Sequence, residues 1–199
     1  PHGDTRMTSK LKTDVLETVS GSGTIALTNQ LSGMTDASMP SGSVLQIVSS
    51  TLTSIVALTS NSTNTFVALG LDTVITPKST SSKILVQVTM NVSHTVGTFH
   101  FRIGRGSDQT ICIGDSAGNN QLSSTTSFRE NGVPYAHQQA PVAMSFMDSP
   151  ATTSATTYQV FGTIGASYAN AVMYLNRAIT QDNGDYDARS TSTITLTEI

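Results

Sequence analysis

The chain has 199 residues, of which 37% are hydrophobic, and a formal net charge of -3. This length accommodates one domain with a sizeable core. The 10 Lys and Arg residues form no cluster, which excludes a nucleic-acid binder, and no apolar run is long enough to insert into a membrane. The single cysteine, Cys112, excludes an internal disulfide, and its isoleucine neighbours predict a small buried side chain.

Hydroxylic side chains dominate the composition, with 27 Ser and 31 Thr, whereas charged residues make up only 12% of the chain. A typical globular domain has about twice that share of charged residues. This balance favours many short strands and exposed loops over charge-covered helices.

The N-terminal residues lack the apolar content of a folded domain. Residues 1–12 have almost no apolar side chains, so we expect them to be disordered or held by a partner. Residues 13–28 indicate two short extended pieces around a Gly-rich turn, and residues 31–42 a flexible linker. The sequence therefore predicts an N-terminal arm or short stem over residues 1–42 and a separate head domain over residues 43–199.

The head domain has the pattern of a β-protein, because its apolar residues fall into short runs bounded by Ser, Thr, Asn, Gly and Pro. In two runs the apolar and polar side chains alternate, with Ile84, Val86 and Val88 on one face of the first and Phe99, Phe101 and Ile103 on one face of the second. The expected strands cover residues 43–48, 65–76, 83–92, 98–105, 110–113, 142–147, 157–164, 171–176 and 193–199. This spacing predicts an all-β fold, an antiparallel β-sandwich or jelly roll.

One long polar interval, residues 114–141, is predicted to be mostly loop. Loops of this length are usually functional or mobile. The alternative is that the segment only crosses between the two sheets or fills a subunit contact.

Four segments of the chain carry a resemblance to a known protein family. They are residues 31–46 (LSGMTDASMPSGSVLQ), 73–77 (TVITP), 79–86 (STSSKILV) and 191–199 (TSTITLTEI). In composition and order these segments resemble the C-terminal modules of fibre-like virion proteins of tailed bacteriophages, and the resemblance covers the chain from about Asp14 to Ile199.

The resemblance implies a homotrimeric head similar to the tumour-necrosis-factor and complement-C1q jelly roll, on a slender stem. The stem would attach to other virion proteins of the capsid, tail or baseplate, and the anchoring residues expected there are Arg6, Lys10, Leu11, Val15 and Leu16. Such proteins have no catalytic residues and no cofactor. No secretory signal is visible in residues 1–16, in agreement with a virion protein made in the host cytoplasm.

Several large side chains of the second half belong either to the core or to a trimer interface, and we favour the core for each. They are Tyr158, Phe161, Tyr168, Met173 and Tyr174.

The sequence offers little for catalysis. There are only 4 His residues and no Gly-x-Ser-x-Gly motif, which argues against a serine hydrolase. A pairing of Cys112 with His94 or His100 is less favoured than an inert core thiol. His100 is expected to be exposed or hydrogen-bonded, and the alternative is a metal site on a trimer axis.

The densest acidic segment, residues 182–187, is best explained as a polar turn, since its Asn-Gly and Asp residues suit tight turns. An ion or ligand contact and a glycosidase carboxylate pair are the alternatives.

Together these observations predict a non-enzymatic virion structural protein, a trimeric fibre or spike that contacts a host-surface glycan through weak but multivalent binding. The alternatives are a capsid decoration (cement) protein and, less favoured, a carbohydrate-binding or depolymerising module. The loops 114–139 and 182–187 are the expected receptor contacts, through Arg129, Tyr135, Asp185, Tyr186 and Asp187.

Overall fold

The computed structural model describes residues 39–59, 65–116, 118–129, 137–165, 170–185 and 187–199. The chain divides into two compact units, Pro1–Met39 and Pro40–Ile199. Residues 1–38 of the predicted arm, which include all of its expected anchoring residues, lie outside the described residues. The fold described below is that of the second unit.

The described residues form eleven strands and no helix. The strands are β1 (Gln46–Leu52), β2 (Val56–Thr59), β3 (Val67–Ile75), β4 (Ile84–His94), β5 (Gly97–Arg105), β6 (Asp108–Cys112), β7 (Thr125–Arg129), β8 (Ala140–Asp148), β9 (Thr156–Ile164), β10 (Val172–Leu175) and β11 (Ser192–Glu198). In the described part of the chain there is thus no helix that could span a membrane.

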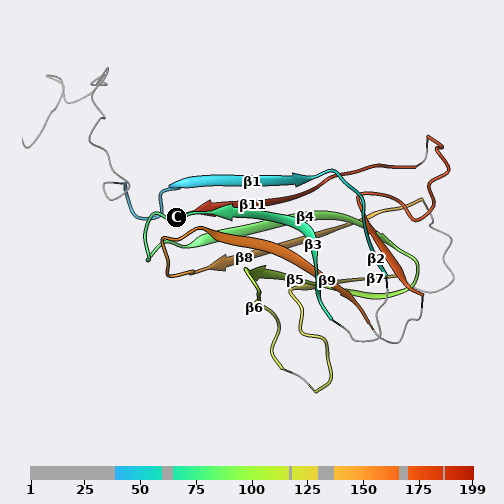
Figure 1. The fold of residues 1–199 in the computed structure, drawn as a ribbon, viewed down its shortest axis with the longest axis horizontal. Coiled ribbons are helices and arrows are strands. Elements are labelled where there is room, and N and C mark those ends of the chain that lie inside the picture. The colour runs from blue at the N-terminus through green and yellow to red at the C-terminus, as the bar shows by residue number, and fades with distance from the viewer. Residues whose placement is uncertain (1–38, 60–64, 117, 130–136, 166–169, 186) are drawn as a thin grey trace, which may run out of the picture. The chain divides into compact units, whose positions relative to one another are not determined.

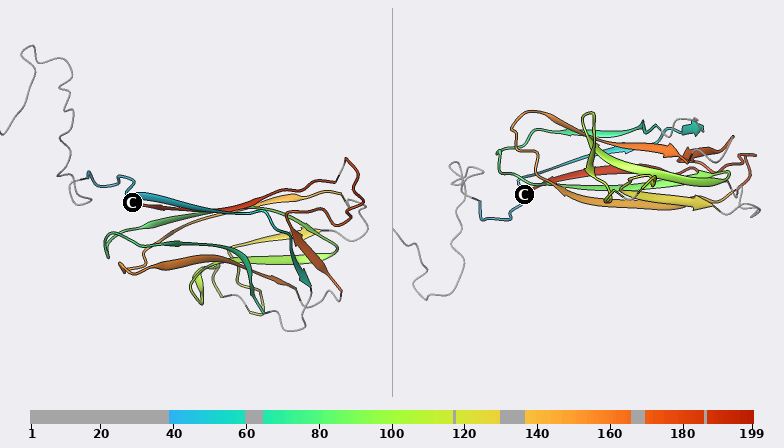
Figure 2. Two further views of the ribbon diagram at one scale, coloured as in Figure 1. Left: turned by 45° about the horizontal axis from the view of Figure 1, so that its top comes forward. Right: turned by 90° about the horizontal axis from the view of Figure 1, so that it is seen from below.

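The strands build two antiparallel sheets packed face to face (Figures 1 and 2). The first sheet has the order β1-β11-β4-β10-β2 with β8 on the other side of β4, and the second has the order β3-β9-β5-β6 with β7 also on β5. From β3 to β10 the chain crosses repeatedly between the two sheets, as it does in a jelly roll. The predicted all-β antiparallel sandwich is confirmed.

Two strand lines of the first sheet are interrupted. β10 pairs with β4 from His94 to Val92, and β11 continues along the same edge of β4 from Thr89. The chain leaves this edge after Asn176 and returns at Ser192. We call residues 177–191 the inserted loop. On the outer side of this line, β1 pairs with β11 and β2 with β10, so the β1/β2 line is broken at the same level.

Asn176 closes the base of the inserted loop. Its side chain donates to the carbonyl oxygens of Leu52 and Ser54, at 2.8 and 2.9 Å, and accepts from Ser192 Oγ at 2.7 Å. Its backbone has a φ of 62°, a left-handed conformation that Asn tolerates better than most residues. One fully buried amide therefore holds both interrupted strand lines together.

The core lies between the two sheets, as the alternation predicts. The inward residues of the two most regular strands are all buried, namely Ile84, Val86, Val88, Phe99, Phe101 and Ile103. Tyr158 and Met173 belong to this core, which confirms the preference for core at these two positions. Phe161 is also buried, but it lies on the outward side of β9 opposite Arg102, and Tyr174 is half-buried on the outward side of β10. Tyr168 lies outside the described residues.

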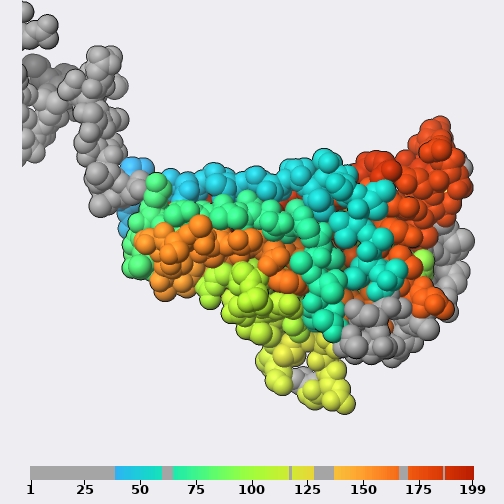
Figure 3. Space-filling view, in the orientation of Figure 1, coloured from blue at the N-terminus to red at the C-terminus, as the bar shows by residue number. Residues whose placement is uncertain are grey.

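Two strands were not expected from the sequence. β2 is only four residues long, and β7 (TTSFR) is too polar to stand out from a loop. Residues 114–141, which were predicted to be mostly loop, include β7, which pairs with β5 from Gly97 to Phe101. Tertiary pairing supplies the hydrogen bonds that make this polar segment a strand. The residues before it project from the body of the head (yellow in Figure 3).

The two ends of the sandwich differ. The start of the head and the C-terminus lie at one end, where Leu45 N donates to Glu198 O at 2.9 Å and Lys83 N donates to Ile199 O at 3.0 Å. The inserted loop lies at the opposite end (red in Figure 1). We call these the closed end and the loop end.

A polar contact joins the two sheets near the closed end. Asp148 of β8 accepts from Tyr158 Oη of β9 at 2.6 Å and from Arg105 Nη1 of β5 at 2.9 Å. Burial, and then the hydrogen bond to Asp148, raise the pKa of Tyr158. The phenol therefore stays protonated and remains a donor to Asp148.

Candidate functional site

The outward face of the first sheet has no charged side chain over the region where β1, β11, β4 and β8 lie side by side. Its outward residues form three rows across these strands. The rows are Ile47, Thr197, Leu85 and Met147; Ser49, Thr195, Gln87 and Ser145; and Thr51, Thr193, Thr89 and Ala143. We call this surface the uncharged face. The first of these rows, which lies nearest the closed end, is apolar at both edges. Ile47 is 62% exposed there and Met147 is 41% exposed.

The outward face of the second sheet is different. It carries two charged residues, the exposed Asp72 on β3 and Arg102 on β5. The guanidinium of Arg102 stacks over the ring of Phe66 at 3.7 Å and donates to Leu122 O at 2.6 Å. Segments outside the sheet thus cover part of this face. The contrast singles out the uncharged face as the surface suited to another protein, because interface centres are depleted in charge.

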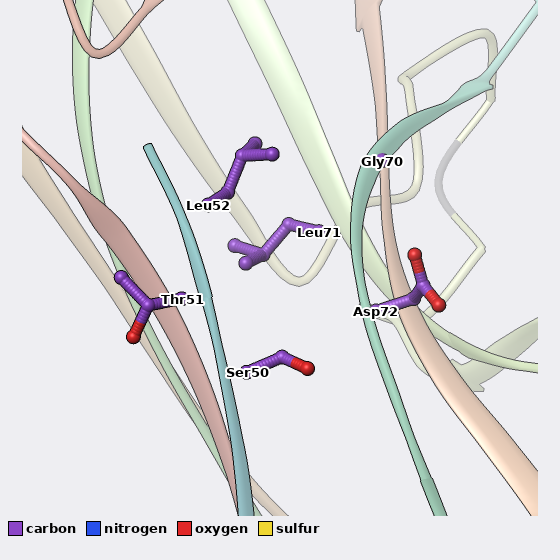
Figure 4. Close-up of a pocket in the computed structure, with 6 residues that line it drawn as sticks. All are labelled: Ser50, Thr51, Leu52, Gly70, Leu71 and Asp72. Atoms are coloured by element: carbon purple, nitrogen blue, oxygen red, sulfur yellow. The ribbon is translucent and has the colours of Figure 1, made fainter. Parts of the chain in front are cut away.

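A groove of about 280 Å³ borders the uncharged face, where the edges of the two sheets meet (Figure 4). Ser50, Thr51 and Leu52 of β1 line one side, and Gly70, Leu71 and Asp72 of β3 line the other. The register of β3 shifts between Ala68 and Asp72, and Gly70 has a φ of 72° there. This bulge twists an edge strand and makes it a poor template for further strand pairing.

The acidic segment 182–187 is a turn within the inserted loop, as predicted. Asn183 has a φ of 60°, Asp187 N donates to Gly184 O at 3.1 Å, and Asp182 N donates to Asp187 Oδ2 at 2.5 Å. Asp187 is therefore part of the turn's own hydrogen bonding.

The inserted loop is attached to the start of β8. Asp187 Oδ1 lies 2.7 Å from Nδ1 of His137, and Gln139 Nε2 donates to Ala188 O at 2.9 Å. The hydrogen bond from His137 holds the pKa of Asp187 below its ordinary value, against the opposing effect of burial. The Asp187 side chain is only 3% exposed. It is thus placed to hold the loop, whereas Asp185 is exposed on the same turn.

The other expected receptor contacts are not brought together in the described structure. Arg129 ends β7, where its backbone pairs with Gly97. Tyr135 and Tyr186 lie outside the described residues. The expected loop 114–139 is divided by β7 into a projecting segment before it and residues 137–139 at the loop end.

Cys112 and His94, which were considered for catalysis, pack against the core or within the interior of the sandwich. Cys112, which was predicted to be buried, is only half-buried and packs against the core. His94 packs its ring on Phe99 in the interior, with Nε2 at 3.1 Å from Ser127 Oγ. Within the described ranges no group of three or more His, Cys, Asp or Glu residues is placed to hold a metal ion.

His100 faces outward from β5, paired with Thr126 on one side and Thr163 on the other. Burial, and then the nearby charge of Arg102, lower the pKa of His100. It is therefore neutral at physiological pH.

No protein-family model matches the chain, and no curated protein matches it. Among solved structures, it is similar to a chain in the structure of infectious bursal disease virus, Gx strain, with a TM-score of 0.34 and 12% identity. The match covers 88% of this chain and 42% of that one, so the chain spans less than half of its neighbour's length.

The uncharged face was missed by sequence reasoning. The alternating hydroxyls of residues 193–197 mark a strand with a polar outer side. The alignment of β1, β4 and β8 beside it is set only by long-range pairing, so no local signal shows that four such strands form one surface without charge.

Proposed function

We propose that the chain is a non-enzymatic virion structural protein whose heads associate as a homotrimer through the uncharged face. The observation that supports this proposal is the absence of charge from the outward side of four adjacent strands. Solvent-facing sheets of monomeric proteins usually carry charged residues, which keep them soluble and oppose association.

The residue types on the face suit contact between polar protein surfaces. Hydroxyl and amide groups form hydrogen bonds without the desolvation cost of charges, and the exposed Ile47 and Met147 supply apolar area at the edges. Cyclic symmetry closes such an association at a defined number of copies. The trimer itself follows from the resemblance to phage fibre-like proteins.

The arrangement of the two ends supports display on a particle. The head begins at the closed end, and the inserted loop lies at the other (Figure 2). A head attached through its N-terminal side would present the loop end outward. Host contact then takes place through that end, with several weak sites acting together.

Light scattering of the purified full chain tests the association. We expect three times the mass of one chain, and we expect Thr195→Lys or Gln87→Lys to give monomers, because each places a charge in the middle row of the face. Thr126→Lys is the matched control, an exposed strand hydroxyl on the other sheet, and should leave the mass unchanged. A monomeric wild-type chain would refute the proposed assembly.

Location on the particle tests the rest of the proposal. A particle that lacks the chain should adsorb poorly to its host while its capsid keeps its stability. Loss of capsid stability with normal adsorption would instead identify a decoration protein.

A further inference from the structure

The base of the inserted loop brings together two arginines that are far apart in the sequence. Arg177 and Arg189 are directly opposite each other in an isolated antiparallel bridge. Residues in such a pair point to the same side of the ladder, with Cβ atoms about 4.5 to 5.5 Å apart. Two arginine side chains therefore leave the backbone side by side at the loop end.

Arg177 is held in place by neutral groups. Its guanidinium lies 4.2 Å over the ring of Tyr174, its Nε donates to Ala178 O at 2.7 Å, and its Nη2 donates to Ile179 O. None of these partners neutralises its charge. Arg189 is exposed.

Neither arginine forms an ion pair with an acid in the described part of the chain. The ion pairs found there join Arg105 to Asp148 and His137 to Asp187. Asp187, the acid of the inserted loop whose side chain is buried, is thus already paired with His137.

Like charges directly opposite each other destabilise a ladder unless something compensates them. Guanidinium groups bind carboxylate, sulfate and phosphate oxygens through paired hydrogen bonds, and a guanidinium that is already fixed loses little entropy in doing so. We propose that Arg177 and Arg189 form a binding site for the carboxylate of an acidic saccharide. This inference rests on the proposed function, because it names the class of host-surface ligand that the loop end would contact.

Titration calorimetry of the full chain tests the site, with alginate oligosaccharide as the carboxylate probe and dextran oligosaccharide as the neutral one. We expect binding of alginate and none of dextran. Arg189→Gln and Arg177→Gln should each weaken binding on the order of tenfold, with Arg189→Lys losing less than Arg189→Gln. Affinity should also fall as salt is added.

Two further variants sharpen the test. Lys83→Gln removes the same charge at the closed end and should leave alginate binding unchanged. Asp185→Asn removes a negative charge from the same loop and should strengthen binding modestly. A dextran sulfate oligosaccharide, which has sulfates and no carboxylates, would overturn the assignment to a carboxylate if it bound more tightly than alginate with the same dependence on both arginines.

The outcomes separate the site from the proposed function. A wild-type trimer that binds no alginate, or that binds equally well after Arg189→Gln, overturns the site and leaves the assembly standing. A monomer that binds alginate through both arginines refutes the assembly and leaves the site standing.

Discussion

The closed end and the loop end of the sandwich are stabilised in different ways. At the closed end, polar contacts lie on continuous strands: Asp148 joins the two sheets, and Glu198 is buried at the end of β11. At the loop end, strand pairing is interrupted. Asn176 joins the two interrupted strand lines there, and the His137/Asp187 pair joins the inserted loop to the start of β8. The difference shows how a jelly roll can contain a long inserted loop while its core stays intact.

The largest effect is expected from Asn176→Ala. The substitution leaves the carbonyls of Leu52 and Ser54 without their donor and places Ala in a left-handed conformation. We expect a loss of about 3 kcal/mol or more in the free energy of unfolding, measured by urea denaturation. Asn170→Ala is the control, because Asn170 has the same φ of 62° but is exposed, and it should cost only about 1 kcal/mol. Equal losses would show that the side-chain hydrogen bonds of Asn176 contribute nothing.

Glu198→Gln should have a smaller, pH-dependent effect. Burial alone would raise the pKa of Glu198, but hydrogen bonds from Ser82, Gln46 and the Lys78 amide outweigh it and hold the pKa below its ordinary value of 4.5. The carboxylate therefore stabilises the fold above that value, and the contribution is lost as the pH falls through the lowered pKa.

We expect Glu198→Gln to cost about 1 to 2 kcal/mol at neutral pH and the variant to approach the wild type in acid. Denaturation curves at several pH values measure this. Asp115→Asn, at an exposed acid, should show neither effect. A difference between wild type and Glu198→Gln that stays constant down to strongly acidic pH would contradict the assignment.

The smallest global effect is expected from Asp187→Asn, which weakens the contact with His137. Hydrogen exchange should become faster in the inserted loop and remain unchanged in the strands, because the loop can open locally. The lowered pKa of Asp187 predicts the same loosening in the wild type as acid protonates this carboxylate. Asp185→Asn, at an exposed position on the same turn, is the control. Faster exchange throughout the core would mean that the loop is part of the folding unit.

Much of the fold was predictable because local patterns repeat along the strands. The alternation around Val86 and Phe101 predicted which side chains are buried, and the Asn-Gly pair predicted the turn at residues 182–187. The short β2 and the polar β7 were not predictable, because neither has an alternation longer than its own few residues. Their strand conformation depends on hydrogen bonds from β10 and β5.

The candidate surfaces were much less predictable than the core. His137 and Asp187 are fifty positions apart in sequence, and Arg177 meets Arg189 only because the inserted loop folds back on itself. The sequence shows the low content of charged residues directly. It does not show how these residues are distributed over the outward faces of the two sheets.

By itself the sequence determined an all-strand head with a single core, since period-two burial is a local property of the chain. Only the tertiary structure decided which strands lie side by side. Cross-strand neighbours come from distant segments, so the uncharged face, the interrupted strand lines and the arginine pair exist only once those segments are paired.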